Sequence, residues 1–118
     1  MTAVIYCRVA RSADAEREKE NNVAKFAELF GYEPTKIFTD IGKSGRDNNR
    51  PEYRRMINNA LNGKIDRIVV KSIDKFNRNT AAAIKTIRQL REKGVEVFIM
   101  QENHENSICN LFAKSIKQ

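Results

Sequence analysis

Residues 65–79, IDRIVVKSIDKFNRN, decide the fold that this sequence predicts. Ile68, Val69 and Val70 form a β-branched apolar run, which is typical of a strand buried on both faces of a parallel sheet. Polar side chains crowd residues 72–78, and an alanine-rich segment with helical spacing comes next. A strand that leads through a polar loop into a helix places the loop at the carboxyl edge of an α/β sheet, where such folds bind ligands. Taken alone, the loop could equally be a solvated connector.

The rest of the chain repeats this alternation of strand and helix. Strands are predicted at residues 3–9, 36–39, 65–71 and 95–100, with the first in the centre of the sheet. Helices are predicted at residues 12–31, 51–63 and 80–94, with a loop at 40–49. This order predicts an α/β domain of three layers, in which helices flank a mainly parallel four-stranded sheet with right-handed crossovers.

Several finer features of the helices are also predicted. Ser12 is expected to cap the first helix, and Pro51 to be the first residue of the second. The inner face of the second helix is predicted from helical spacing: Tyr53, Met56, Ile57, Ala60 and Leu61. A last helix would carry Ile108, Leu111, Phe112 and Ile116 on one face.

Size and composition favour a single cytoplasmic domain. The 118 residues, of which 41% are hydrophobic, suffice for one core but not for two. No apolar run approaches the roughly 20 residues of a membrane span, and no basic segment of a signal peptide precedes the first strand. Cys7 and Cys109 lack metal-ligand spacing, so reduced cysteines that pack in the interior are expected.

The net charge of +7 suggests an anionic partner, most often nucleic acid, although a soluble basic surface is the simpler alternative. In the predicted sheet, strand ends bring basic residues to one edge, with Arg8 near the end of the first strand, Arg50 after the second and Arg78 after the third. Guanidinium groups that converge in this way fit a phosphate. With His104 as the only histidine and no GxxxxGK loop, neither a metal site nor nucleotide hydrolysis is expected.

Three motifs carry a resemblance to a known family. They are YCRV at residues 6–9, the pattern of Asp40, Ser44-Gly45 and Arg50-Pro51, and IDKFNRN at residues 73–79. In this order and spacing, the chain resembles the catalytic domain of the serine recombinases, the resolvase/invertase family, over essentially its whole length.

The resemblance implies a specific reaction on DNA. In this family a serine attacks a DNA phosphodiester, giving a 5′-phosphoserine link and a free 3′-hydroxyl, so that rejoining needs neither ATP nor metal. By position, Arg8, Arg50 and Arg78 would clamp the phosphate as its charge grows. Ser44 would donate a hydrogen bond nearby, and Asp74 would orient the arginines or assist proton transfer.

One departure from the family pattern concerns the nucleophile. The position two residues after Arg8 is Ala10, whose methyl group cannot attack phosphorus. Three explanations stay open: a serine-to-alanine variant made to trap an inert form, a naturally silent homologue that binds or regulates, or a substitute nucleophile at Ser12. A helix cap remains the simpler interpretation of Ser12.

The remaining site candidates are basic or polar residues near these motifs. Lys75 stands where the family usually has arginine, which keeps the charge but loses the bidentate fork. Arg46, Lys71 and Asn77 are further candidates for contact with DNA, although a solvated position is the simpler interpretation of Arg46.

The last predicted helix resembles the beginning of the family's dimerisation helix, so a homodimer or tetramer is expected. Residues 1–118 would form the catalytic domain alone, without the family's separate DNA-binding region, and would bind DNA weakly and salt-dependently. The main alternative is a non-catalytic DNA-binding or regulatory protein on the same fold. A flavodoxin- or receiver-like module is disfavoured because Arg8 stands where an acidic cluster would be needed.

Overall fold

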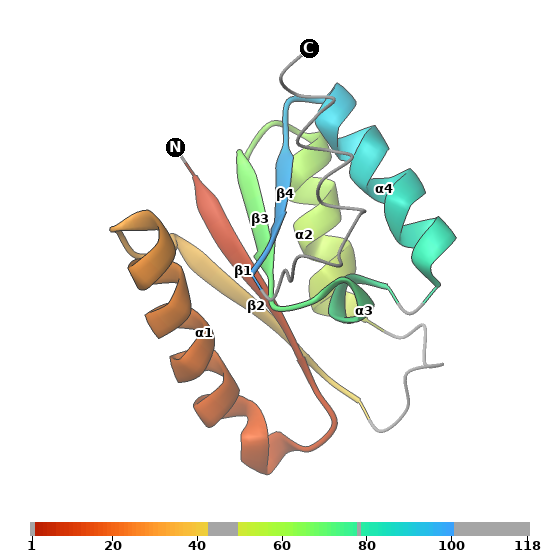
Figure 1. The fold of residues 1–118 in the computed structure, drawn as a ribbon. Coiled ribbons are helices and arrows are strands. Elements are labelled where there is room, and N and C mark those ends of the chain that lie inside the picture. Colours follow the sequence, from red (N-terminus) through yellow and green to blue (C-terminus); the bar gives the residue numbers. More distant parts are fainter. Residues whose placement is uncertain (1, 43–49, 78, 101–118) are drawn as a thin grey trace.

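The computed structural model describes residues 2–42, 50–77 and 79–100. Within them, four parallel strands form one sheet in the order β2-β1-β3-β4 (Figure 1). The strands are β1 (Ala3–Val9), β2 (Lys36–Ile41), β3 (Arg67–Val70) and β4 (Glu96–Ile99). The prediction of a parallel sheet with the first strand in its centre is therefore confirmed.

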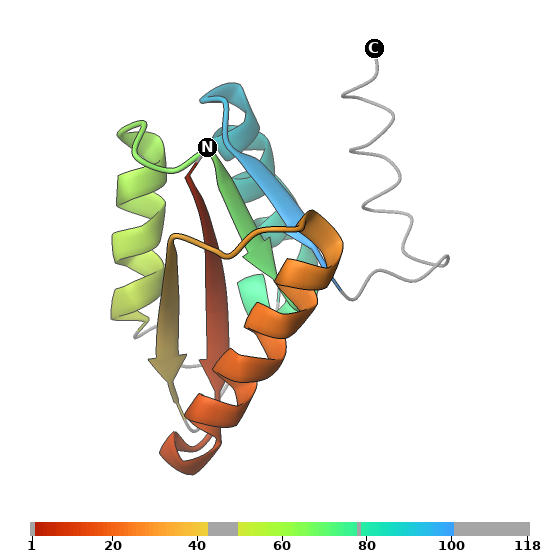
Figure 2. The ribbon, with the colours of Figure 1, turned by 90° about the vertical axis from the view of Figure 1, so that its left-hand side faces the viewer.

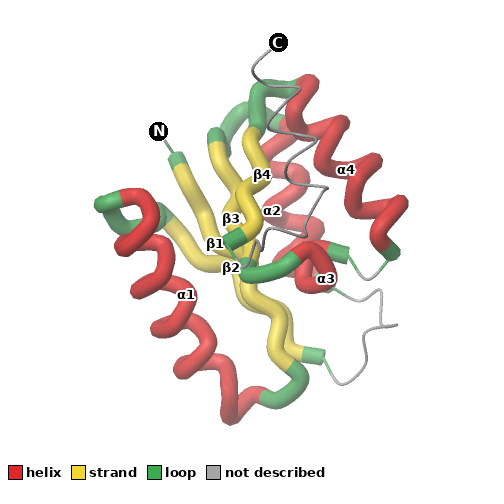
Figure 3. The backbone as a smooth tube through the Cα atoms, in the orientation of Figure 1, coloured by secondary structure: helices red, strands yellow, loops and turns green. Residues whose placement is uncertain are grey.

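Helices cover both faces of the sheet (Figure 2). The helix α1 (Ala15–Phe30) lies on one face, after a short 3-10 turn at Ser12–Asp14. The other face carries α2 (Pro51–Leu61), α4 (Thr80–Glu92) and the single-turn α3 (Ile73–Phe76). The predicted three layers are thus confirmed in the described residues, and Figure 3 shows α3 just after the end of β3.

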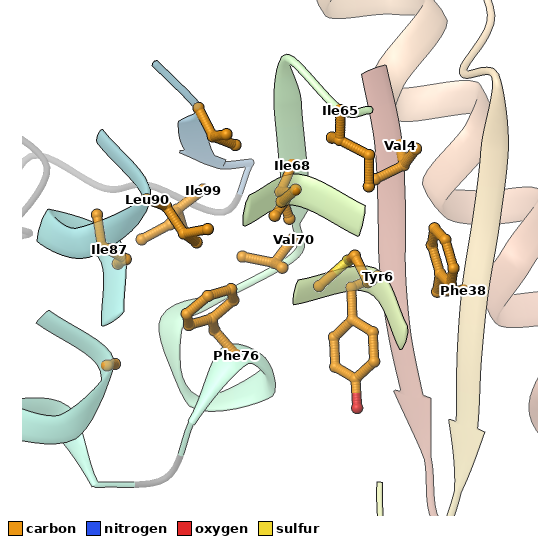
Figure 4. Packing of buried hydrophobic residues seen from close by; sticks show 14 residues of the cluster. Val4, Tyr6, Phe38, Ile65, Ile68, Val70, Phe76, Ile87, Leu90 and Ile99 are labelled. Carbon is orange, nitrogen blue, oxygen red and sulfur yellow. The ribbon is translucent and has the colours of Figure 1, made fainter. Parts of the chain in front are cut away.

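Alternating strand residues supply two separate cores. On the α1 face, Ile5 and Val69 pack with Phe26 of the helix. On the opposite face, Tyr6 and Val70 pack with residues of α2, α3 and α4, and Figure 4 shows this larger cluster. Buried apolar runs without alternation are what a sheet covered on both faces requires.

The strand register leaves the end of β1 beyond its neighbour. β3 ends with Val70 opposite Tyr6, whereas the pairing of β1 with β2 continues through Arg8 opposite Asp40 to Val9 opposite Ile41. The last residues of β1 therefore extend beyond the end of β3 at the carboxyl edge of the sheet, and α3 packs against β1.

Several predicted boundaries are wrong in informative ways. β2 is two residues longer than predicted and includes Asp40, and residues 73–76 are helical rather than an open loop. Leu61, predicted to face the core, is exposed, although its neighbour Ala60 in the same turn of α2 is fully buried. Ser12 lies inside the 3-10 turn and does not cap α1, whose N-cap is Asp14.

Other predictions hold or lie outside the described residues. Pro51 begins α2, and α1 ends at Gly31, whose φ of 77° is a left-handed conformation that favours glycine. The predicted last helix lies among residues 101–118, outside the described part. No helix within residues 2–42, 50–77 and 79–100 is long and apolar enough to span a membrane.

Candidate functional site

The end of β1 places two of the predicted site residues. Arg8 and Tyr6 are two residues apart and share the face that α2 covers, about 6.6 Å apart along the strand. The guanidinium of Arg8 lies beside Gly42, where an added Cβ would be 3.8 Å from Nη2. Ala10 is exposed just past the strand, at the point where the Gly42 N–H donates to the Val9 carbonyl at 2.9 Å.

Asp40 ties the start of α2 to the sheet. Its side chain is buried and accepts three hydrogen bonds: from the Tyr6 hydroxyl at 2.8 Å and from the backbone N–H groups of Glu52 and Tyr53, both at 3.0 Å. The N-cap residue of α2, Arg50, makes no capping hydrogen bond with its own side chain. Asp40 thus satisfies two of the free N–H groups of α2 from the neighbouring strand. The Arg50 side chain has no hydrogen-bond acceptor and cannot cap these groups itself.

Arg50 joins the segment after β2 to the segment after β3. Its Nη1 donates to the Phe76 carbonyl at 2.7 Å, and its Cζ lies 3.8 Å from the centroid of the Tyr53 ring and 6.0 Å from that of Tyr6. Among the residues that the structure describes, no carboxylate forms an ion pair with it. The half-buried cation is therefore held by a carbonyl and aromatic faces, which do not cancel its charge.

Three packed aromatic rings, those of Tyr6, Tyr53 and Phe76, lie next to Arg50. The rings of Tyr6 and Phe76 each meet the ring of Tyr53 edge to face, with centroids 5.3 Å apart in both pairs. Burial raises the pKa of both tyrosine hydroxyls, and Arg50 opposes that rise. In Figure 4 the Tyr6 hydroxyl points toward the arrowhead end of the strands. Because both hydroxyls stay protonated at neutral pH, they add no negative charge beside Arg50.

The turn after β3 brings three predicted residues to the same edge. Asp74 is exposed and accepts a hydrogen bond from the Ser72 hydroxyl at 2.5 Å, and Lys75 is half-buried in the single turn of α3. The side-chain oxygen of Asn77 accepts the Asn79 N–H at 2.9 Å, which holds the turn into α4. This position gives Asn77 a local structural role that does not depend on DNA.

Lys71 lies apart from this group. It follows Val69 on the α1 face of the sheet and forms an ion pair with Glu18 of α1 at 3.3 Å. Cys7 lies on the same face, where the Asn22 amide donates to its sulfur at 2.9 Å and burial raises the pKa of the thiol. The expected interior position of Cys7 is confirmed.

The other predicted residues, Ser44, Arg46 and Arg78, lie outside the described residues. Within the described part, no cluster of three or more histidine, cysteine or carboxylate side chains could hold a metal ion. The described site is therefore an edge with two arginines, one lysine and an aromatic support, which suits a phosphate group.

Sequence reasoning missed the roles of Tyr53 and Asp40. The helical spacing of Tyr53 predicted a core residue, and this packing role was enough to explain a tyrosine at that position. Its position three residues after Arg50, on the same side of the first turn of a helix, was the available signal. Asp40 was assigned to a loop because nothing in the sequence marked the end of β2.

Comparison with known proteins identifies the same architecture. The family described as the resolvase N-terminal domain matches residues 3–115. The N-terminal catalytic domain of TP901-1 integrase superposes with a TM-score of 0.73 at 22% identity, covering 99% of this chain and 94% of that one. The C-terminal catalytic domain of ISC1926 TnpA, an IS607-like serine recombinase, gives 0.69 at 18% identity, covering 98% and 78%. A resolvase family site-specific recombinase from Streptococcus pneumoniae gives 0.67 at 21% identity, covering 99% and 87%.

Proposed function

The chain belongs to the resolvase family of serine recombinase catalytic domains, and we propose that it binds a DNA phosphodiester at the carboxyl edge of its sheet without cleaving it. Arg8 and Arg50 would hold the phosphate oxygens, with Lys75 and the predicted Arg78 adding positive charge. Ser44 would donate a hydrogen bond, and Asp74 would orient the basic groups. Arg46, Lys71 and Asn77 would contact the DNA outside this centre.

The observation that carries this proposal is the state of Arg50. The guanidinium is half-buried and oriented by Phe76 and Tyr53, yet no carboxylate among the described residues lies within ion-pair distance of it. Keeping a cation partly out of water is unfavourable unless an anion completes the site. A phosphate oxygen between Arg50 and the end of β1 would do so, and bidentate bonding from guanidinium favours it.

Cleavage by the family reaction would require a hydroxyl at position 10. A serine there would form a bond from its Oγ to phosphorus, the bond from phosphorus to O3′ would break, and the released O3′ would take up a proton. Ala10 has no atom that can perform this attack. The arginines can still stabilise the charge of the phosphate, so binding without strand breakage is the expected activity of this sequence.

Ala10 also favours a second candidate function, that of a regulatory protein which occupies recombination sites or pairs with active relatives. Both functions need the same phosphate contacts. They differ in the effect of Ala10→Ser, which should restore DNA cleavage in a disabled enzyme but not in a regulatory protein. The predicted association through residues 108–116 lies outside the described part of the chain and stays a prediction. The assignment of residues 1–118 to one catalytic domain and the cytoplasmic location also stay predictions.

Removing either arginine should weaken binding to DNA and reduce its dependence on salt. We expect the Arg8→Ala and Arg50→Ala variants to bind a labelled duplex about tenfold more weakly, whatever its sequence. Each lost phosphate contact should reduce the slope of log affinity against log salt by about 0.9. Fluorescence anisotropy between low and physiological salt measures both quantities.

The matched control is Arg88→Ala on α4, an exposed arginine away from the sheet edge. It should change affinity less than twofold. Equal losses in all three variants would mean that DNA binds a diffuse basic surface, which would refute the proposed site.

A further inference from the structure

We propose that Tyr53 is a positioning residue that fixes the guanidinium of Arg50 in the orientation needed for phosphate. This inference rests on the proposed function of Arg50. It assigns to a side chain in the first turn of α2 a task beyond filling the core, and it gives the site a stated requirement for an aromatic ring at this position.

The contact geometry defines what the ring does. The Arg50 Cζ lies 3.8 Å from the centroid of the Tyr53 ring, which is close for a cation over an aromatic face. The opposite end of the group is fixed because Nη1 donates to the Phe76 carbonyl at 2.7 Å. The ring contact and the hydrogen bond thereby hold the guanidinium at two points, which restricts the directions in which its other N–H groups can donate.

The ring itself is held firmly. Its backbone N–H donates to the buried carboxylate of Asp40 at 3.0 Å. Tyr6 and Phe76 meet it edge to face, with interplanar angles of 66° and 75°. Tyr53 therefore has a fixed place on the scaffold, whereas the arginine that it contacts is a long side chain with many rotamers.

An aromatic ring suits this task better than a carboxylate would. An aspartate or glutamate beside Arg50 would orient it equally well but would neutralise its charge and compete with phosphate. A ring face attracts the cation through its quadrupole and leaves the full positive charge for the ligand. The burial that raises the pKa of Tyr53 keeps the hydroxyl neutral as well.

The simpler alternative is that Tyr53 only packs against the core, since it does contact the large cluster between the sheet and α2. Two substitutions separate these roles. Tyr53→Phe keeps the ring and removes the hydroxyl, whereas Tyr53→Leu keeps an apolar side chain and removes the ring face. A packing role alone predicts that Tyr53→Leu is harmful whether or not Arg50 is present, because the smaller side chain loses the contacts with Tyr6 and Phe76.

The first measurement is affinity for a labelled DNA duplex at low salt. We expect Tyr53→Leu to bind about fivefold more weakly and Tyr53→Phe to bind within about twofold of the unaltered chain. In an Arg50→Ala background, Tyr53→Leu should cause no further loss, because a residue that acts through Arg50 has nothing left to position.

The second measurement does not depend on DNA. The Nε–Hε proton signal of Arg50 should lie upfield of the other arginines because of the ring current of Tyr53. It should stay there in Tyr53→Phe and move to the ordinary position in Tyr53→Leu. Unchanged backbone amide spectra for α4 and β4 would establish that each variant is folded.

The possible failures can be told apart. If Arg50→Ala binds DNA as well as the unaltered chain, the proposed function is wrong and this inference falls with it. If Arg50→Ala binds weakly but Tyr53→Leu does not, or if Tyr53→Leu weakens binding equally in both backgrounds, the phosphate site stands and the positioning role is refuted. An Arg50 signal that is insensitive to Tyr53→Leu also refutes it.

Discussion

Replacing Ala10 with serine is expected to give this chain a covalent link to DNA, which the unaltered sequence should not form. The new hydroxyl would stand at an exposed position just past β1, two residues beyond Arg8. In a serine protease, removing the nucleophile lowers kcat roughly a million-fold. Restoring a nucleophile should therefore produce a covalent adduct where the unaltered chain gives none.

The experiment joins residues 1–118 to a sequence-specific DNA-binding module and uses substrates nicked near the cleavage point, which trap the intermediate. We expect Ala10→Ser to yield a band of protein attached to the 5′-phosphate strand, with a free 3′-hydroxyl on the other fragment. Adding Arg8→Ala should remove most of the adduct, because the arginine stabilises the charge of the attacked phosphate. Adding Ser12→Ala should leave the adduct intact.

Two outcomes would contradict this expectation differently. Retained DNA binding without an adduct in Ala10→Ser would favour the regulatory function over a disabled enzyme. An adduct formed by the unaltered chain and abolished by Ser12→Ala would show that Ser12 is the nucleophile. The structure gives Ser12 no role as a helix cap that would argue against this.

Asp40→Ala should be the most destabilising substitution in the candidate site. It removes the acceptor of three buried or half-buried hydrogen bonds and leaves the Glu52 and Tyr53 N–H groups and the Tyr6 hydroxyl without their partner. Each unsatisfied buried group costs about 1–3 kcal/mol, so we expect the free energy of unfolding to fall by about 3 kcal/mol. Urea denaturation followed by circular dichroism measures this change.

Asp74→Ala is the matched control, because Asp74 is an exposed carboxylate at the same sheet edge. It should change the free energy of unfolding by less than about 0.5 kcal/mol. Asp40→Asn keeps one acceptor oxygen and should fall between the two. A loss below about 1 kcal/mol in Asp40→Ala would show that α2 does not depend on this cap.

The fold was largely predictable because its signals are local. Buried parallel strands require uninterrupted apolar runs, and residues 3–9 and 68–70 provide them. Gly31 and Pro51 mark helix ends through backbone conformations that few other residues favour. These features act within a few residues and so can be read from one sequence.

The site was less predictable because its contacts join distant segments. Asp40 belongs to β2 because it pairs with Arg8, 32 positions earlier, and not because of its neighbours. Lys71 was predicted as a further DNA contact, and its position relative to the site was not predictable: residues alternate between the two faces of a strand, which places Lys71 on the α1 face beside Glu18. Residues 73–76 form a helical turn whose Phe76 is buried in the core, and the polar residues around Phe76 gave no signal of that burial in the sequence.

The most direct test of the phosphate site follows the arginine side chains themselves during titration with a short DNA duplex. The Nε–Hε signals of Arg8 and Arg50 should shift together and saturate at the same DNA concentration, and that of Arg88 should not move. Shifts confined to Arg88 and other helix-surface arginines, with Arg8 and Arg50 unchanged at saturation, would show that this edge of the sheet does not bind DNA.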